Sequence, residues 1–211
     1  MSDRTQVPPG LTRDRPIRRG RAALLVIDVQ HGTVGPGTKE AQPAFHAAAT
    51  GRAIPNIARL LAAFRAARLE VIFTVIENLT ADGRDRSLDY KLSGISVAKG
   101  SWEARMPDAV APQRDELVLP KTSSSVFNST VLDYVLRNIG IEDVFVTGFL
   151  TDQCVDHAIK DGADRGFYMS CVHDACAAES PARHEAALDC FRGYCRMLST
   201  DEALRLVAAV Q

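Results

Sequence analysis

Residues 22–28 read Ala-Ala-Leu-Leu-Val-Ile-Asp, an unbroken apolar run that ends in a single carboxylate. A strand that is apolar at every position needs cover on both faces, and the interior of a parallel sheet provides that cover. Residues 70–76, Glu-Val-Ile-Phe-Thr-Val-Ile, form a second run of the same kind. Between the two runs, residues 54–67 carry apolar side chains at helical spacing along one stripe. This strand–helix–strand order predicts the start of a parallel sheet.

The same alternation continues to the end of the chain. Further apolar runs predict strands at 115–120, 143–147, 167–172 and 194–199. Helices are predicted to begin at Ser129 or Thr130, near Asp152, at Pro181 and at Asp201. In the first of these, Asp133 is placed to complete a capping box and Gly140 to end the helix. The pattern predicts an α/β fold with helices on both faces of a parallel sheet.

The length of 211 residues fits one α/β domain. We expect residues 1–21, which mix Arg, Asp and Pro, to form an N-terminal arm, and residues 22–211 to form the domain. The arm is either loose surface chain or a clasp on a partner subunit. Residues 78–111 are irregular and rich in charge, which predicts a lid or a binding loop, with a plain surface insertion as the alternative.

The composition argues against several classes of partner. The formal net charge is −1, so there is no electrostatic case for nucleic acid or an anionic membrane. No apolar run approaches the ~20 residues of a membrane span. Five cysteines at irregular spacing favour the reduced thiols of a cytoplasmic protein over a disulfide framework. Four of them, at 171, 176, 190 and 195, are expected in the core.

Three reactive side chains fall at the carboxyl ends of predicted strands, where open α/β sheets bind ligands. Asp28 ends the first strand, Lys121 follows the third, and Cys154 lies after the fourth at the start of a helix. A helix N-terminus and a nearby cation favour the thiolate of Cys154, and Lys121 supplies the cation. Asp28 can take the thiol proton, and backbone N–H groups at 150–154 can hold an oxyanion.

Each of these residues has an ordinary explanation when taken alone. An Asp after a strand is often a turn former, a Cys on a helix is usually core, and a Lys at a strand end is usually solvated. His157 lies three residues after Cys154, so a Cys–His dyad is a further alternative. The three residues Asp28, Lys121 and Cys154 gain weight because they share one edge of the same predicted sheet.

Four groups of residues match, in order, the motifs of a known enzyme family. They are Leu25-Val-Ile-Asp-Val-Gln30; Lys121-Thr-Ser-Ser-Ser-Val-Phe127 with Ser129, Thr130 and Leu132; Gly148-Phe-Leu-Thr-Asp-Gln-Cys-Val155; and Asp174-Ala175 with Ser180-Pro181 and His184-Glu185. On these segments the sequence resembles the isochorismatase-like cysteine hydrolases, from about residue 22 to the C-terminal helix. The set is specific, whereas any one motif alone would be weak.

The resemblance implies a catalytic triad of Asp28, Lys121 and Cys154. It also implies a non-proline cis peptide just before the nucleophile, at Phe149–Leu150, which turns backbone N–H groups toward the substrate oxygen. The implied fold is a doubly wound, six-stranded parallel sheet. With the strand order 3-2-1-4-5-6, Asp28 and Cys154 lie on either side of the switch point.

Departures from the family pattern narrow the activity. The nicotinamidase branch binds a metal through an Asp-x-His pair after the first strand and a further His, but residues 50–56 contain neither Asp nor His. His31-Gly32-Thr33 replaces the aromatic residue that often follows the Asp-x-Gln motif. We therefore expect no metal and no cofactor. True isochorismatases lack the nucleophilic cysteine, so Cys154 favours acyl transfer.

The segment at 86–94 resembles ureidoacrylate and biuret amidohydrolases. Arg side chains bind carboxylates through a two-pronged fork, so Arg84 and Arg86 are candidates for orienting a small polar substrate. The alternative is that such residues are solvated parts of the loop. The candidate substrate-binding residues are Gln30, Arg86, Tyr90, Lys91, Trp102 and Phe127.

The sequence therefore predicts a cytoplasmic, cysteine-dependent hydrolase. It would cleave an amide or ureido C–N bond of a small molecule through a thioester, and the family suggests a homodimer or homotetramer. The alternatives are a non-catalytic binding or scaffold protein on the same fold, and a metal-dependent nicotinamidase-like enzyme. A thiol redox protein is disfavoured, because no second cysteine stands in a Cys-x-x-Cys arrangement with Cys154.

Overall fold

A six-stranded, all-parallel sheet runs through the computed structural model, which describes residues 11–210. The strands are β1 (Ala22–Ile27), β2 (Glu70–Ile76), β3 (Leu117–Lys121), β4 (Asp143–Phe149), β5 (Tyr168–Ala177) and β6 (Arg196–Leu198). Their order in the sheet is β3-β2-β1-β4-β5-β6, so the sheet grows in opposite directions from β1. The predicted fold class and strand order are confirmed. The switch point lies between β1 and β4.

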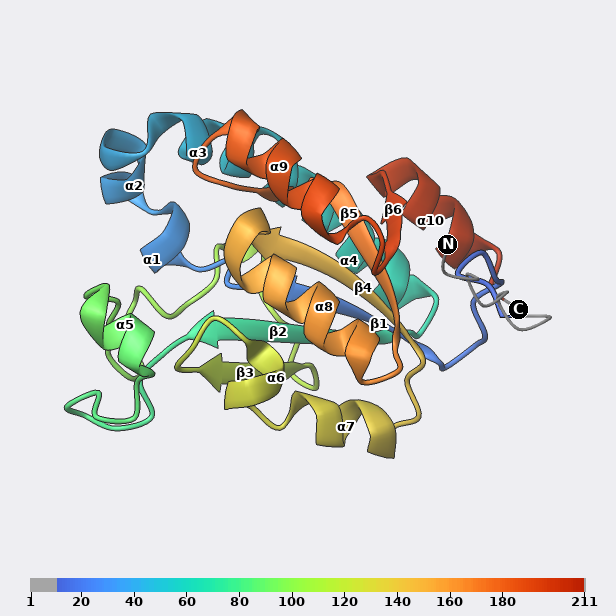
Figure 1. Ribbon diagram of the computed structural model, residues 1–211, viewed down its shortest axis with the longest axis horizontal. Helices are drawn as coiled ribbons and strands as arrows, with labels where there is room; N and C mark the ends of the chain where they lie inside the picture. Colours follow the sequence, from blue (N-terminus) through green and yellow to red (C-terminus); the bar gives the residue numbers. More distant parts are fainter. Residues whose placement is uncertain (1–10, 211) are drawn as a thin grey trace, which may run out of the picture.

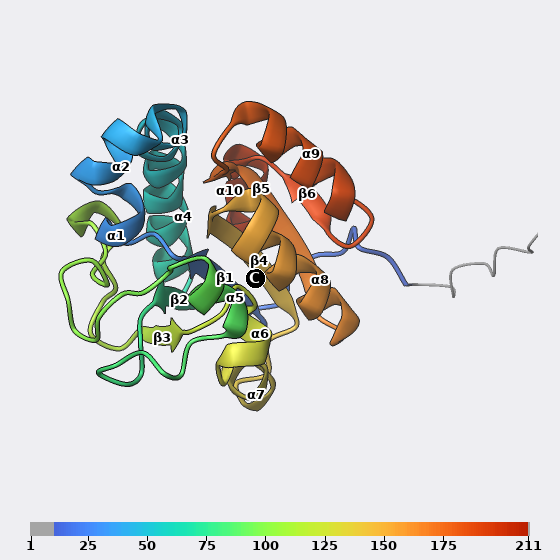
Figure 2. The ribbon, with the colours of Figure 1, turned by 60° about the vertical axis from the view of Figure 1, so that its left-hand side comes forward.

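Helices cover both faces of the sheet. The α-helices are α1 (His31–Val34), α2 (Pro36–Ala41), α3 (Pro43–Ala48), α4 (Ile54–Ala66), α5 (Leu88–Leu92), α6 (Val126–Ser129), α7 (Leu132–Asn138), α8 (Asp156–Asp164), α9 (Pro181–Phe191) and α10 (Thr200–Ala208). Short turns of other helix types are η1 (Ala49–Ala53), η2 (Asp108–Val110) and η3 (Thr151–Val155). Figure 2 shows α4 and α8 on opposite sides of β1 and β4.

Two apolar cores hold these layers together, one on each face of the sheet. All six residues of β1 are buried, and alternate residues face opposite cores: Leu24 and Val26 pack with α4, while Leu25 and Ile27 pack with α8 and α9. A central parallel strand must be apolar on both faces for this reason. The unbroken run at 22–27 is the sequence signature of that double cover.

The helix predicted to begin at Ser129 or Thr130 is α7, which begins two residues later at Leu132, and a short helix that was not predicted, α6, precedes it. Ser125 is the cap of α6, because its side chain accepts a hydrogen bond from the backbone N–H of Asn128. Ser129 and Thr130 instead donate their hydroxyl protons to carbonyls one turn back, at Ser125 and Val126. The chain therefore makes the short α6 first, and α7 begins at Leu132, whose backbone N–H donates to the Thr130 hydroxyl oxygen over 3.1 Å.

Two other boundaries differ from the prediction. β5 runs on to Ala177, because an irregularity in its pairing with β4 lets the register resume between Gly148 and Cys176. The last helix is capped by Ser199 rather than opened by Asp201, and Glu202 completes a capping box with Ser199. Both features depend on contacts or spacings that a hydrophobic pattern does not reveal.

The described part of the N-terminal arm, residues 11–21, packs on the sheet. Arg15 lies 2.6 Å from the buried carboxylate of Asp143 and 3.0 Å from Glu142, and it stacks over the Tyr168 ring. Residues 1–10 of the predicted arm lie outside the described residues. The described part of the arm is thus joined to the amino ends of β4 and β5.

Gly148 allows β4 to approach β1 closely beside the switch point. Its φ is +110°, a conformation that favours glycine, and it pairs with Ile27, the last residue of β1. A Cβ atom at this position would lie 2.1 Å from the carbonyl oxygen of Ile27. The backbone that carries Asp28 and the backbone that leads to Cys154 therefore touch through this glycine.

We predict that Gly148→Ala lowers the free energy of unfolding by about 3 kcal/mol or more, because backbone atoms must move apart to admit the methyl group. Chemical denaturation monitored by circular dichroism measures the loss. Gly193→Ala is the matched control, since a Cβ there meets nothing within 4 Å. Equal stability of the two variants would contradict the close approach.

Candidate active site

A cleft of about 1000 Å³ opens at the carboxyl ends of β1 and β3, where the turn that follows β4 begins. Figure 1 shows the strand arrowheads pointing toward the end of the molecule where α1, α2 and α5 gather. The cleft is lined by Asp28 and Cys154, by the serines at 123–125, and by residues of α5 and of the turn after β4. It therefore lies where open α/β sheets bind ligands.

Asp28 stands directly after β1 and is almost fully buried. Its φ is +54°, a conformation that Asp tolerates better than most residues, and the bend turns its side chain into the cleft. Thr74 on β2 fixes the carboxylate, because its hydroxyl donates to Asp28 Oδ1 over 2.7 Å. The second oxygen, Oδ2, is left for another partner.

Lys121, the last residue of β3, is that partner. Its Nζ lies 2.8 Å from Asp28 Oδ2, and its side chain is completely buried. The ammonium group also donates to Tyr90 Oη over 3.0 Å and to the carbonyl of Ser123 over 2.9 Å. A fourth contact, 3.3 Å long, reaches Cys154 Sγ. One buried ammonium thus contacts four groups, at residues 28, 90, 123 and 154.

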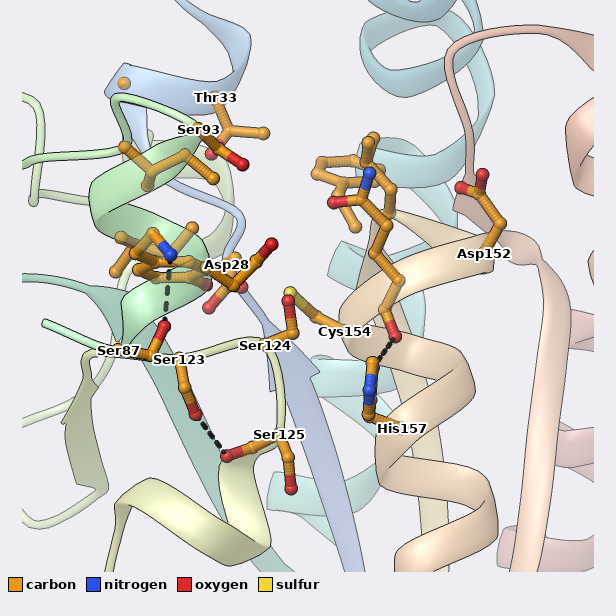
Figure 3. Close-up of a pocket in the computed structure, with 18 of the residues that line it drawn as sticks. Asp28, Thr33, Ser87, Ser93, Ser123, Ser124, Ser125, Asp152, Cys154 and His157 are labelled. Atoms are coloured by element: carbon orange, nitrogen blue, oxygen red, sulfur yellow. Dashed lines mark hydrogen bonds between the residues drawn. The ribbon is translucent and has the colours of Figure 1, made fainter.

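Cys154 lies in η3, the π-helical turn between β4 and α8, and is 5% exposed. The peptide bond between Phe149 and Leu150, just before this turn, is cis, as the family resemblance implied. Figure 3 shows the Cys154 sulfur turned toward Asp28, with Asp152 and His157 to the other side. The structure therefore brings the three sequence-predicted catalytic residues together, with Asp28 and Cys154 both within contact distance of Lys121.

Burial controls the charge of the cysteine. Burial and the negative charge of Asp28 raise the pKa of Cys154, and they outweigh the opposite effect of Lys121, so that the pKa rises to about 11. Burial also acts to lower the pKa of Lys121, but the charges of Asp28 and Cys154 reverse this and the net shift is upward. These shifts favour a neutral Cys154 thiol beside the Asp28–Lys121 ion pair, in contrast to the thiolate expected from the sequence.

Of the six candidate substrate-binding residues, Tyr90 lines the cleft. Burial and the negative charges around it raise the pKa of its hydroxyl group, so it stays protonated beside Lys121. Phe127 instead packs in the core, where its ring stacks on Phe167. Trp102 stacks on His31 at a ring distance of 4.2 Å and lines a separate, mainly apolar hollow.

The side chains of the remaining three candidates form hydrogen bonds with backbone groups. Gln30 donates to the carbonyl oxygens of Ile76 and Glu103 and accepts from the backbone N–H of Ile76. Arg86 donates to the carbonyls of Gly83 and Ile95, and Lys91 donates to that of Arg84. None of these three side chains lines the cleft, and their role in substrate binding stays a prediction.

Backbone hydrogen bonds also tie the loop after β1 to the distant segment that contains Trp102. His31 N–H donates to the Arg105 carbonyl, and Gly32 N–H donates to the Glu103 carbonyl, each over 2.8 Å. The segment around α5 is anchored as well, because Ser87 N–H donates to the Thr122 carbonyl over 2.9 Å. The irregular stretch at 78–111 therefore forms part of the cleft wall.

Several lining residues were not singled out from the sequence. Ser123, Ser124, Asp152 and Gln153 lie inside two of the matched motifs, so their motif membership was the available signal. Phe45, from α3, gave no such signal, because an apolar helix position is normally core. His157 lines the cleft but makes a hydrogen bond to the carbonyl of Gln153, and its side chain is exposed.

The expected absence of a metal remains a prediction. Within residues 11–210, no three His, Cys, Asp or Glu side chains are grouped so that they could hold an ion. No helix in the described part of the chain is long and apolar enough to cross a membrane.

The expected core position of Cys190 is wrong, because its side chain is exposed on α9.

We predict that alkylation of Cys154 by iodoacetamide, with no substrate added, keeps accelerating above about pH 9. The reason is that the pKa of this thiol is raised to about 11. Asp28→Asn should speed alkylation near neutral pH, because it removes a negative charge that raises the pKa of the thiol. Peptide mass spectrometry at each pH measures the rate, with Cys190 in the same digest as the exposed control. A plateau below about pH 8 in the unmodified protein would mean that the thiolate already exists.

Comparisons with known proteins identify the family. A family model described as isochorismatase domain matches residues 22–203. The chain is 32% identical to the ureidoacrylate amidohydrolase RutB of Methylorubrum extorquens, with 88% of this chain and 86% of that protein covered. It is also 32% identical to the ureidoacrylate amidohydrolase RutB of Klebsiella pneumoniae, with 80% and 78% covered. A cysteine hydrolase from Pseudomonas syringae superposes with a TM-score of 0.80 at 25% identity, over 92% of this chain and 96% of that one. The chain belongs to the isochorismatase-like hydrolase family.

Proposed function

We propose that this protein is a cysteine-dependent amidohydrolase that cleaves an amide or ureido C–N bond of a small molecule. One observation carries the proposal: Lys121 Nζ lies within 3.3 Å of both the Asp28 carboxylate and the Cys154 sulfur, and these two residues line the cleft. These are the groups that an acyl transfer to sulfur requires, namely a nucleophile, a proton carrier and a cation. The amidohydrolase names of the curated relatives support the choice of bond.

The first step forms a covalent bond to sulfur. Asp28 takes the proton of the Cys154 thiol as Sγ attacks the substrate carbonyl carbon, whose π electron pair moves onto oxygen. Asp28 Oδ2 suits this role, because Thr74 holds the other carboxylate oxygen and Lys121 lies beside Oδ2. The raised pKa of Cys154 means that the thiolate forms only when a proton acceptor and an electrophile are both in place.

The second step breaks the C–N bond. The tetrahedral intermediate collapses, the nitrogen leaves with the proton that Asp28 received, and a thioester remains on Cys154. The same carboxylate then removes a proton from water, which attacks the thioester and releases the acid product. The thiol regains its proton, so every atom and charge is restored. Asp28 thus acts alternately as base and acid within one cycle.

Lys121 and the turn after β4 hold the charges in place during these steps. Lys121 keeps its proton, because its pKa is raised, and its ammonium group stabilises the sulfur anion that forms 3.3 Å away. Phe149 and Leu150 line the cleft, and we assign the oxyanion to backbone N–H groups near Leu150 and Cys154. Tyr90 and the Ser123 carbonyl fix the ammonium by hydrogen bonds.

We predict that Cys154→Ser lowers turnover by about a thousandfold or more, because the hydroxyl has no base strong enough to activate it here. Ammonia release from a panel of small amides and ureides measures turnover, and circular dichroism reports whether the fold is kept. Cys190→Ser is the matched control and should keep full activity, since Cys190 lies exposed on α9.

Mass spectrometry of acid-quenched reactions supplies a second test. The substrate acyl group should appear on the peptide that contains Cys154, with the leaving amine lost. An acyl group on a different cysteine would contradict the assignment. Silence across a broad panel, together with a Cys154 that does not react with alkylating agents at any pH, would favour a non-catalytic scaffold on this fold.

A further inference from the structure

The cleft that holds the proposed nucleophile is lined by carboxylates. Asp28, Asp89, Asp152 and Glu179 all contribute to its surface. Among the described residues that line it, none is Lys or Arg. The charge that a bound molecule meets therefore depends on which of the four carboxylates have partners.

Asp28 is neutralised and adds no net charge. Its partner Lys121 lies 2.8 Å away and is fully buried, so both charges of the pair are already engaged with one another. The Lys121 ammonium group also donates hydrogen bonds to Tyr90 and to the Ser123 carbonyl. The ammonium group is consequently saturated and is not a free anchor for a carboxylate on a ligand.

Asp152 in η3 and Glu179 after β5 share a single guanidinium, that of Arg183. Arg183 donates to Asp152 Oδ2 over 2.5 Å and also contacts Glu179. Two negative charges and one positive charge leave this cluster with a net charge of −1. Asp152 Oδ1 is buried and accepts no hydrogen bond from residues 11–210, so it keeps an unused acceptor. Figure 3 shows Asp152 across the cleft from Ser93 and Thr33.

Asp89 adds a second negative charge from α5. Its side chain is exposed, and it forms no ion pair with the described residues. The basic residues of the same loop are engaged elsewhere: Arg86 and Lys91 donate to backbone carbonyls, and Arg84 pairs with Asp82. The wall opposite Asp152 therefore presents a carboxylate that forms no ion pair with the described residues.

We infer that the cleft selects substrates whose non-reacting part carries no negative charge, that is, uncharged or amine-bearing amides and ureides. An added carboxylate would meet the negative charge of Asp89 and the net charge of −1 on the Asp152, Glu179 and Arg183 cluster, with no Lys or Arg among the residues that line the cleft. The relatives are named for ureidoacrylate, which is itself a carboxylate, so this chain takes a different class. The inference about substrates rests on the proposed function, whereas the charge of the cleft does not.

Charged thiol reagents measure the field at Cys154 without any substrate. The cationic trimethylammonioethyl methanethiosulfonate and its anionic sulfonatoethyl counterpart each form a mixed disulfide with the thiol and release methanesulfinate. We predict that the cation:anion rate ratio at Cys154 exceeds the same ratio at exposed Cys190 by about tenfold or more at low salt. Both reagents need the same thiolate, so its abundance cancels from the ratio.

Charge variants identify the source of the preference. Asp89→Lys and Asp152→Asn should each move the Cys154 ratio toward the Cys190 ratio by about threefold or more, because each removes negative charge from the cleft wall. Asp164→Lys is the matched control, since Asp164 is exposed on α8, lies outside the cleft and should leave the ratio unchanged. A Cys154 ratio equal to that of Cys190, or one that favours the anion, would overturn the inference.

Matched substrates then separate this inference from the proposed function. Ureidopropionate, propylurea and aminoethylurea share one reacting group and differ in the charge of the other end. The inference predicts that kcat/KM for ureidopropionate is lowest by about tenfold or more, and that Asp89→Lys narrows the gap. Turnover that is fastest on the anion would overturn the inference and leave the amidohydrolase standing. Turnover of none of them, with a high cation:anion ratio at Cys154, would count against the proposed function alone.

Discussion

The buried ion pair between Lys121 and Asp28 is the interaction on which the site depends. Two charges taken out of water cost on the order of several kcal/mol each, and their mutual attraction offsets this only with good geometry and further hydrogen bonds. Here Thr74, Tyr90 and the Ser123 carbonyl supply those bonds. The pair also links the ends of β1 and β3, which are not neighbours in the sheet because β2 lies between them. The strand order therefore places the ends of β1 and β3 where this ion pair can form.

Much of the fold was predictable because burial leaves a clear pattern. A strand covered on both faces is expected to be apolar; β1 is apolar at every position, and β2 is apolar except at Glu70 and Thr74. The catalytic candidates were also predictable, since the carboxyl ends of parallel strands share one edge. What the sequence could not show was the choice between competing hydrogen bonds. Ser125 rather than Ser129 caps a helix, and nothing in the local pattern separates the two.

The surroundings of the site were less predictable for the same physical reason. Arg86 and Lys91 are the residue types that bind a carboxylate ligand, yet both are engaged by carbonyl oxygens of their own loop. The charge state of Cys154 depends on burial by segments far away in the sequence, so a helix-start argument alone favours the wrong protonation state. The sequence shows the chemistry of each side chain, but it does not show the direction in which that side chain points.

The hydrogen bonds that join residues 31–32 to residues 103–105 have a consequence for how the cleft exchanges its contents. Together with the anchor at Ser87, they fasten the stretch at 78–111 at points along its length. A hinged flap would have to break several backbone hydrogen bonds at once before it swung away. Small molecules then enter and leave the cleft by diffusion through an opening that stays formed. Conformational change is confined to the spans between the hydrogen-bonded points.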